Sequence, residues 1–72
     1  MIDPIRFGDT SDAVMAVQMR LQALGYRITA INGAFDNDML CAVTAFQRAS
    51  GIFGEDGFVG PETWKKLRMT EE

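Results

Sequence analysis

The chain has 72 residues, which is near the smallest size at which a hydrophobic core alone stabilises a domain. A hydrophobic content of 47% argues against disorder, and a net charge of −3 argues against binding to nucleic acid or to an anionic membrane. With one cysteine and no histidine, the chain cannot build an internal disulfide, a Cys/His zinc site or a Ser–His catalytic pair. We therefore expect no metal, no cofactor and no enzyme activity, although catalysis by carboxylates alone stays open.

Residues 1–9 are expected to be extended, because Pro4 disfavours a helix at Asp3. Ile5 is expected to tuck against the core. The segment is not a signal peptide, since no basic region is followed by a long apolar run, and no part of the sequence is a transmembrane segment. An extracytoplasmic role would need a signal outside this sequence or another export or release route.

The first predicted helix begins after an N-cap at Thr10 or Ser11. One helical face is marked by apolar residues at spacings of 3, 4 and 3, namely Val14, Val17, Leu21 and Leu24. Gly25 is expected to end this helix in a left-handed conformation, and Tyr26 to fold back over Leu21.

The second predicted helix runs from about Asn37 to Ser50 and is capped by Asp36. Its inward face is expected to carry Met39, Val43 and Phe46. Gly51 is expected to end the helix as Gly25 ends the first, with Ile52 packing back towards Phe46.

The third predicted helix runs from Pro61 to about Arg68, with Gly60 as its N-cap. Val59 then precedes the cap and Trp64 takes the fourth helical position, an arrangement known as a hydrophobic staple. We expect residues 69–72 to be a tail or the start of a linker.

A weak internal repeat relates residues 32–43 to residues 56–67 without gaps. Each unit has a tight Asn-Gly or Asp-Gly turn, an apolar residue, a cap and then a helix. The sequence therefore predicts an all-α fold, a compact bundle of three short helices joined by structured loops. We expect residues 1–72 to form a single domain with its core in residues 5–68.

The ordered set of turns and helix ends resembles the peptidoglycan-binding domain found beside the catalytic domains of bacterial and phage cell-wall hydrolases. The residues that carry the resemblance are Gly8, Val14, Val17, Gln18, Leu21, Gly25, Tyr26, Asn32, Gly33, Phe35, Ala42, Val43, Phe46, Gln47, Gly51, Ile52, Asp56, Gly57, Val59, Gly60, Thr63, Trp64 and Leu67. Three positions depart from the usual pattern, Asn32, Asp36 and Met39, and the loop 52–56 is about one residue longer than typical.

The resemblance implies a monomeric, non-catalytic module that binds peptidoglycan, through its glycan strand or its stem peptide. Such a module would anchor a linked or associated cell-wall hydrolase to its substrate, in the cell wall or periplasm. A related module occurs in the propeptide of matrix metalloproteinases, so the alternative is a protein-interaction module that packs on a catalytic domain.

Five residues are candidates for ligand contact: Tyr26, Arg27, Asn32, Phe53 and Phe58. Phe58 should point away from the core because its neighbour Val59 points into it, and Phe53 lies in a glycine-containing loop. For Phe58, chance exposure is an equal alternative, and the case for Phe53 is slightly weaker, because its ring could simply pad the loop. Tyr26 is favoured as a cover for the first helix and Arg27 as a solvated side chain, although Arg27 could meet peptidoglycan carboxylates.

Structural roles are favoured for the remaining conspicuous polar and aromatic side chains. Trp64 is expected in the core rather than stacked on a sugar, and Gln18 and Gln47 are expected to tie down the loops. Asp56 is expected to form an Asx-turn, and Cys41 to be a semi-buried small apolar residue.

The acidic run 36–38 resembles a calcium loop only superficially, because the twelve-residue pattern with a terminal glutamate is absent. Helix capping by Asp36 is the favoured role. A glycosidase pair formed by Asp36 and Asp56 is disfavoured, because nothing places the two carboxylates across a cleft.

Overall fold

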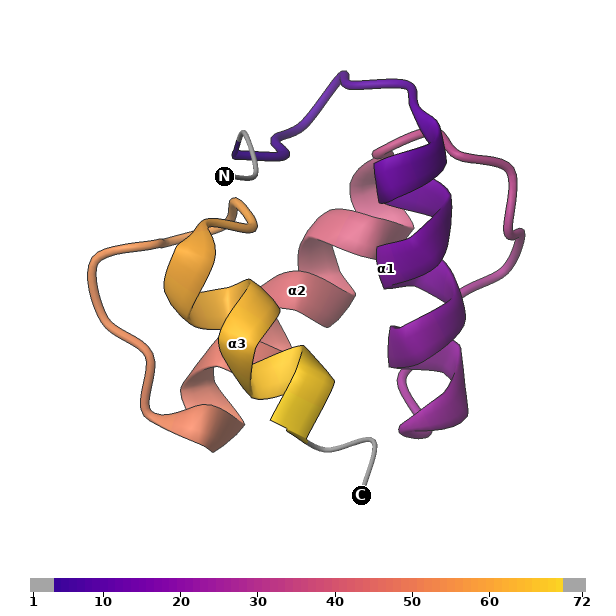
Figure 1. The fold of residues 1–72 in the computed structure, drawn as a ribbon. Helices are drawn as coiled ribbons and strands as arrows, with labels where there is room; N and C mark the ends of the chain where they lie inside the picture. The colour runs from indigo at the N-terminus through magenta and orange to yellow at the C-terminus, as the bar shows by residue number, and fades with distance from the viewer. Residues whose placement is uncertain (1–3, 70–72) are drawn as a thin grey trace.

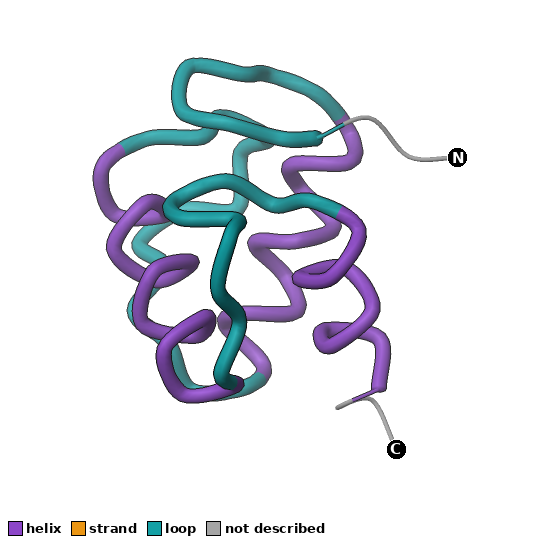
Figure 2. Tube along the Cα trace, turned by 90° about the vertical axis from the view of Figure 1, so that its left-hand side faces the viewer, coloured by secondary structure: helices purple, strands orange, loops and turns teal. Residues whose placement is uncertain are grey.

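The computed structural model describes residues 4–69, which contain three helices, α1 (Asp12–Ala23), α2 (Asn37–Ser50) and α3 (Pro61–Met69). All three helices begin at the same end of the molecule, here called the N-cap end, and finish at the opposite C-cap end (Figure 1). Each connection therefore runs back along the outside of the bundle (Figure 2). Helix α1 contacts both α2 and α3. The all-α, three-helix prediction is confirmed.

Helices α1 and α2 begin as predicted, on side chains that accept backbone N–H groups. The hydroxyl of Ser11 accepts from the amide of Val14 at 3.2 Å, and a carboxylate oxygen of Asp36 accepts from the amide of Met39 at 3.1 Å. Each bond pairs a donor that the first helical turn would otherwise leave unsatisfied.

Helix α1 ends in a hydrogen-bonded glycine turn. Gly25 has φ of 97°, its amide donates to Gln22 O at 3.0 Å, and the amide of Tyr26 donates to Leu21 O at 3.0 Å. This pair of bonds is the Schellman pattern. The predicted glycine ending of α1 is confirmed.

Helix α2 ends in the same way. Gly51 has φ of 72°, and the amide of Ile52 donates to Gln47 O at 2.9 Å. Ile52 and Phe46 are both buried in the core. Two parallel helices therefore stop with the same turn, and each turn sends the chain back towards the N-cap end.

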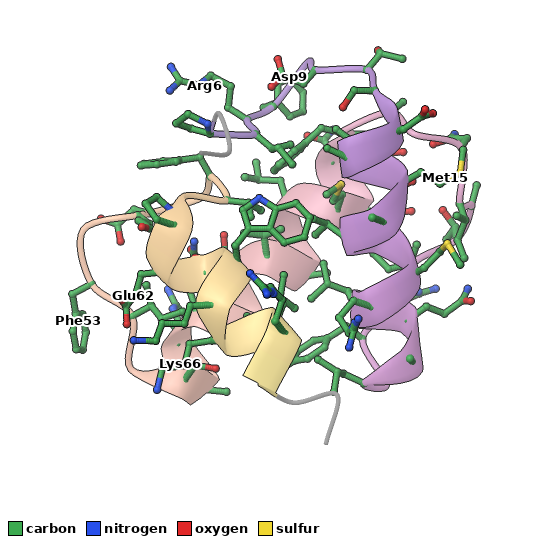
Figure 3. All side chains as sticks on the ribbon, viewed as in Figure 1. Arg6, Asp9, Met15, Phe53, Glu62 and Lys66 are labelled. Carbon is green, nitrogen blue, oxygen red and sulfur yellow. The ribbon has the colours of Figure 1, made fainter. Side chains whose placement is uncertain are left out.

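The segment before α1 crosses the N-cap end and joins the two repeat units (Figure 3). Ile5 pairs with Val59 through bonds of 2.9 and 2.7 Å, while the amide of Gly8 donates to Phe35 O and the amide of Phe35 to Asp9 O. Ile5 is 4% exposed, so its predicted place against the core is confirmed.

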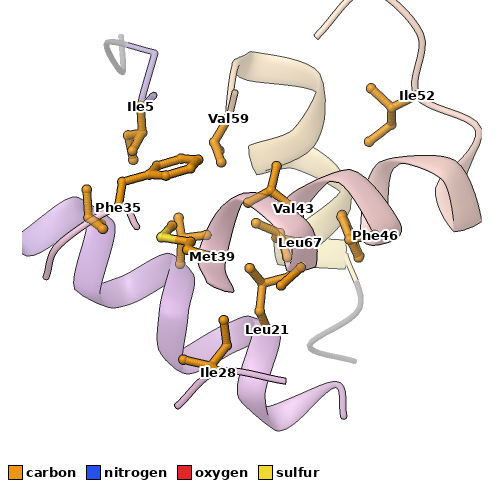
Figure 4. Packing of buried hydrophobic residues seen from close by; sticks show 13 residues of the cluster. Ile5, Leu21, Ile28, Phe35, Met39, Val43, Phe46, Ile52, Val59 and Leu67 are labelled. Atoms are coloured by element: carbon orange, nitrogen blue, oxygen red, sulfur yellow. The ribbon is translucent and has the colours of Figure 1, made fainter. Parts of the chain in front are cut away.

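The core is continuous through all three helices and both connections (Figure 4). Its buried apolar members are Ile5, Val14, Val17, Leu21, Ile28, Phe35, Met39, Ala42, Val43, Phe46, Ile52, Val59 and Leu67. Trp64 packs against this cluster but is only half-buried. Its indole Nε1 is buried and has no hydrogen-bond partner within residues 4–69.

Two predictions about the helices need correction. Met69 is the last residue of α3 and not part of a tail; residues 70–72 lie outside the described range. Cys41 is exposed and not semi-buried. It lies two residues from both Met39 and Val43, and a two-residue step turns an α-helix by about 200°, so Cys41 faces away from the core.

None of the helices described here is long and apolar enough to cross a membrane. Residues 4–69 also hold no group of three or more His, Cys, Asp or Glu side chains that could bind a metal ion.

Candidate ligand-binding surface

Gln18 on α1 holds the first tight turn. Its Oε1 accepts from the amides of Asn32 at 3.1 Å and Gly33 at 2.8 Å, and its Nε2 donates to Ala34 O at 2.9 Å. Gln18 is 1% exposed. One buried side chain thus satisfies three backbone groups of the turn.

Gln47 on α2 holds the second turn in the same manner. Its Oε1 accepts from the amide of Gly57 at 3.0 Å, and its Nε2 donates to Phe58 O at 2.7 Å and to the hydroxyl of Thr63 at 3.1 Å. Both glutamines therefore tie loops to helices, as predicted. The connecting loops are pre-shaped surfaces rather than free chain.

Glu55 caps α3, a role that the sequence did not suggest. The N-cap residue Gly60 has no side chain, and Glu55 reaches its position from the preceding loop. One carboxylate accepts from the amides of Gly60 at 3.2 Å, Glu62 at 2.9 Å and Thr63 at 2.9 Å, and from the Thr63 hydroxyl at 2.8 Å. A glycine N-cap followed by proline was the available signal that another group must supply the acceptor.

This arrangement changes the acidity of Glu55. Partial burial by itself raises the pKa of the carboxyl, but the hydrogen bonds from Glu62, Thr63 and Gly60 favour the carboxylate and hold the pKa below its ordinary value. Glu55 is thus a charged group that stabilises the start of α3, where the positive end of the helix dipole also lies.

The predicted Asx-turn at Asp56 is wrong. The Asp56 side chain forms no hydrogen bond within the described part of the chain, because Gln47 holds the turn and Glu55 caps the helix. The first unit does contain such a turn, in which Asn32 Oδ1 accepts from the amide of Ala34 at 3.0 Å.

Two of the five candidate contact residues, Asn32 and Phe58, lie in the clamped turns. Asn32 is exposed, but its side-chain oxygen is engaged in the turn. Phe58 is half-buried and not exposed as predicted, and the guanidinium carbon of Arg6 lies 5.7 Å from the centre of its ring. A cation held over the ring stabilises this arrangement and covers one face of Phe58.

The other three candidates, Tyr26, Arg27 and Phe53, follow the ends of α1 and α2 at the C-cap end. Tyr26 is half-buried and meets Phe46 edge to face, with ring centroids 6.0 Å apart and planes at 82°. Arg27 is exposed. Phe53 is 89% exposed and points away from the bundle (Figure 3).

The structure thus does not gather the five candidates into one cluster. Two belong to turns that are already hydrogen-bonded, and three belong to the C-cap end. Sequence spacing could not separate these groups, since the division depends on the helices being parallel and on each connection running the length of the bundle.

The chain matches the model of the peptidoglycan binding domain family over residues 10–67. It is 39% identical to a spore cortex-lytic enzyme of Halalkalibacterium halodurans over 66 residues, which are 92% of this chain and 20% of that enzyme. The chain spans half or less of the length of the curated relatives that it matches.

Solved structures with the same fold include the following two. The N-terminal domain of SleB matches with a TM-score of 0.89 and 26% identity, over 97% of this chain and 94% of that domain. An L,D-transpeptidase of Xylanimonas cellulosilytica matches with a TM-score of 0.88 and 38% identity, over 96% of this chain and 33% of that structure. The helices, both turns and the capping residues described above lie within or beside the matched range, and the chain belongs to the peptidoglycan-binding domain family.

Proposed function

We propose that this chain binds bacterial peptidoglycan without cleaving it and anchors a linked or associated cell-wall enzyme to that polymer. The observation that carries this proposal is the family match over residues 10–67. Relatives that extend beyond the matched region include a spore cortex-lytic enzyme and an L,D-transpeptidase. An anchor raises the local concentration of bonds available to such an enzyme, so a modest affinity suffices.

A non-catalytic role is supported by what the acidic side chains do. Asp36 and Glu55 accept helix amides, and Asp9 accepts from the amide of Arg6 at 3.0 Å. These carboxylates are held in structural bonds, and the chain has no histidine to activate a nucleophile.

We place the peptidoglycan contact at the C-cap end, with Phe53 as its main aromatic group. An aromatic ring that is 89% exposed offers an apolar face on which a sugar ring or a peptide can pack. Tyr26 and Arg27 would flank it. Asn32 and Phe58 are less suitable, because their polar or aromatic faces already have partners.

The test is co-sedimentation with purified sacculi, comparing Phe53→Ala with Phe7→Ala. Phe7 is 56% exposed at the N-cap end, so it controls for the loss of an exposed phenyl ring. We expect the fraction bound to fall for Phe53→Ala and to stay near the wild-type value for Phe7→Ala. If both variants bind equally well, Phe53 is not part of the contact surface.

A further inference from the structure

Charge is divided between the two ends of the bundle. The acidic residues of the described range precede a helix or lie in its first turn: Asp9, Asp12, Asp36, Asp38, Glu55, Asp56 and Glu62. The basic residues, apart from Arg6, lie at or past the middle of a helix or after its end: Arg20, Arg27, Arg48, Lys65, Lys66 and Arg68. The helices are parallel (Figure 1), so among residues 4–69 this pattern places acidic side chains at the N-cap end and basic side chains at the C-cap end.

The two sets of charges differ in what they do. Four of the acidic side chains accept hydrogen bonds inside the fold; besides Asp9, Asp36 and Glu55, Asp38 accepts from the hydroxyl of Thr29 at 2.6 Å. By contrast, five basic side chains form no hydrogen bond or ion pair with residues 4–69. They are Arg27, Arg48, Lys65, Lys66 and Arg68, here called the basic cluster.

Helix dipoles account for part of this pattern. A cation in the last turn of a helix is favourable, and Arg48, Lys66 and Arg68 occupy such positions. Arg27, however, lies outside every helix. Three helix C-termini supply about half a negative charge each, which is well below the charge of the five cations, so the described residues of the C-cap end carry a net positive charge.

We propose that the basic cluster binds the carboxylates of peptidoglycan stem peptides. This inference rests on the function proposed above and specifies its ligand chemistry. Stem peptides present carboxylates repeatedly along a glycan strand, and guanidinium groups such as those of Arg27 and Arg48 can bind a carboxylate through two parallel hydrogen bonds.

The geometry suits an extended anion rather than a small one. The molecule measures 26 × 24 × 20 Å, and the cluster draws on the ends of α2 and α3 and on the segment after α1. Because these cations come from three separate segments, a single small anion would pair with few of them, and salt screens its attraction to the rest. A polymer with repeated carboxylates can engage several at once, while Phe53 contacts its apolar parts.

The protein arm of the test compares two double variants with the same change in net charge. Arg27→Gln/Arg48→Gln removes two cations from the C-cap end, whereas Ser11→Asp/Asn37→Asp adds two anions at the N-cap end and keeps a capping oxygen at position 11. Circular dichroism checks that both are folded. For sacculi from a Gram-negative bacterium, which carry no teichoic acid, we expect the first variant to bind on the order of fivefold more weakly at low salt. The second variant should bind as tightly as the wild type, or lose much less affinity than the first variant.

The ligand arm uses sacculi whose carboxylates have been converted to amides with carbodiimide and methylamine. Wild-type binding should fall on these sacculi, and on unmodified sacculi it should fall as NaCl rises from 50 to 300 mM. Equal wild-type binding to both preparations, without salt dependence, overturns this inference and leaves peptidoglycan binding intact. If the folded wild type does not bind unmodified sacculi at all, both proposals are overturned.

Discussion

Glu55 and Thr63 are joined twice through one carboxylate oxygen, which accepts from the Thr63 amide at 2.9 Å and from its hydroxyl at 2.8 Å. The same hydroxyl accepts from Gln47 Nε2 at 3.1 Å, and Thr63 is fully buried. The chain Glu55–Thr63–Gln47 therefore links the loop before α3 to the first turn of α3 and to α2. This link fixes the shape of the segment that follows Phe53.

Replacing Glu55 by glutamine should lower the free energy of unfolding by about 1–2 kcal/mol, because the cap of α3 loses its charge and one acceptor site. Urea titration followed by circular dichroism measures the change. Glu62→Gln is the matched control, since Glu62 also lies at the start of α3 but its side chain caps nothing within the described residues. A similar loss in both variants would contradict the capping role.

The contribution of Glu55 should depend on pH. Because its pKa is lower in the folded than in the unfolded state, the stabilisation is complete above the ordinary glutamate pKa of about 4.3 and is lost as the pH falls through the folded value. The difference in unfolding free energy between wild type and Glu55→Gln should therefore shrink from pH 6 to pH 2.5. A difference that stays constant over this range would show that the charge of Glu55 does not matter.

The two glutamine clamps should be far more important for stability than a surface glutamine. Gln18→Met or Gln47→Met leaves backbone groups of a tight turn without partners and should cost about 2–4 kcal/mol. Gln22→Met removes one bond of 3.3 Å at an exposed position and should cost less than about 1 kcal/mol. The midpoints of urea unfolding, compared at an unchanged m-value, measure the loss of stability in each of the three variants. Equal losses would argue against the role of the two buried glutamines in holding the turns.

The effect on stability of substituting Gly60 should depend on Glu55. A Cβ atom at position 60 would lie 2.6 Å from the Glu55 carboxylate, although the backbone there is not in the left-handed region. Gly60→Ala should therefore displace the cap and cost about 1–2 kcal/mol in the wild type, but about 1 kcal/mol less in a Glu55→Ala background. A double-mutant cycle measures this coupling, and additive losses would rule out the displacement.

The fold could be predicted closely because its signals are local. The interval from Asp36 to Gly51 contains a cap, an apolar stripe and a terminating glycine, and the structure has α2 over Asn37–Ser50 as predicted. The glycine endings at Gly25 and Gly51 were predicted for the same reason, since each depends on residues within one helical turn.

The surface was less predictable because it depends on contacts between distant segments. The cap of α3 by Glu55 needs a loop that folds back over five residues. The contact of Arg6 with the Phe58 ring joins the segment before α1 to the segment before α3. The division of charge was also hidden, because it appears only when the three helices are known to be parallel.

Peptidoglycan binding is tested most directly by co-sedimentation of the folded wild-type chain with purified sacculi. We predict that the chain leaves the supernatant as sacculi are added and that it releases no labelled fragments from them. Complete recovery in the supernatant, with the helical circular dichroism signal intact, would show that the chain does not bind peptidoglycan and would favour a protein-interaction role for the domain.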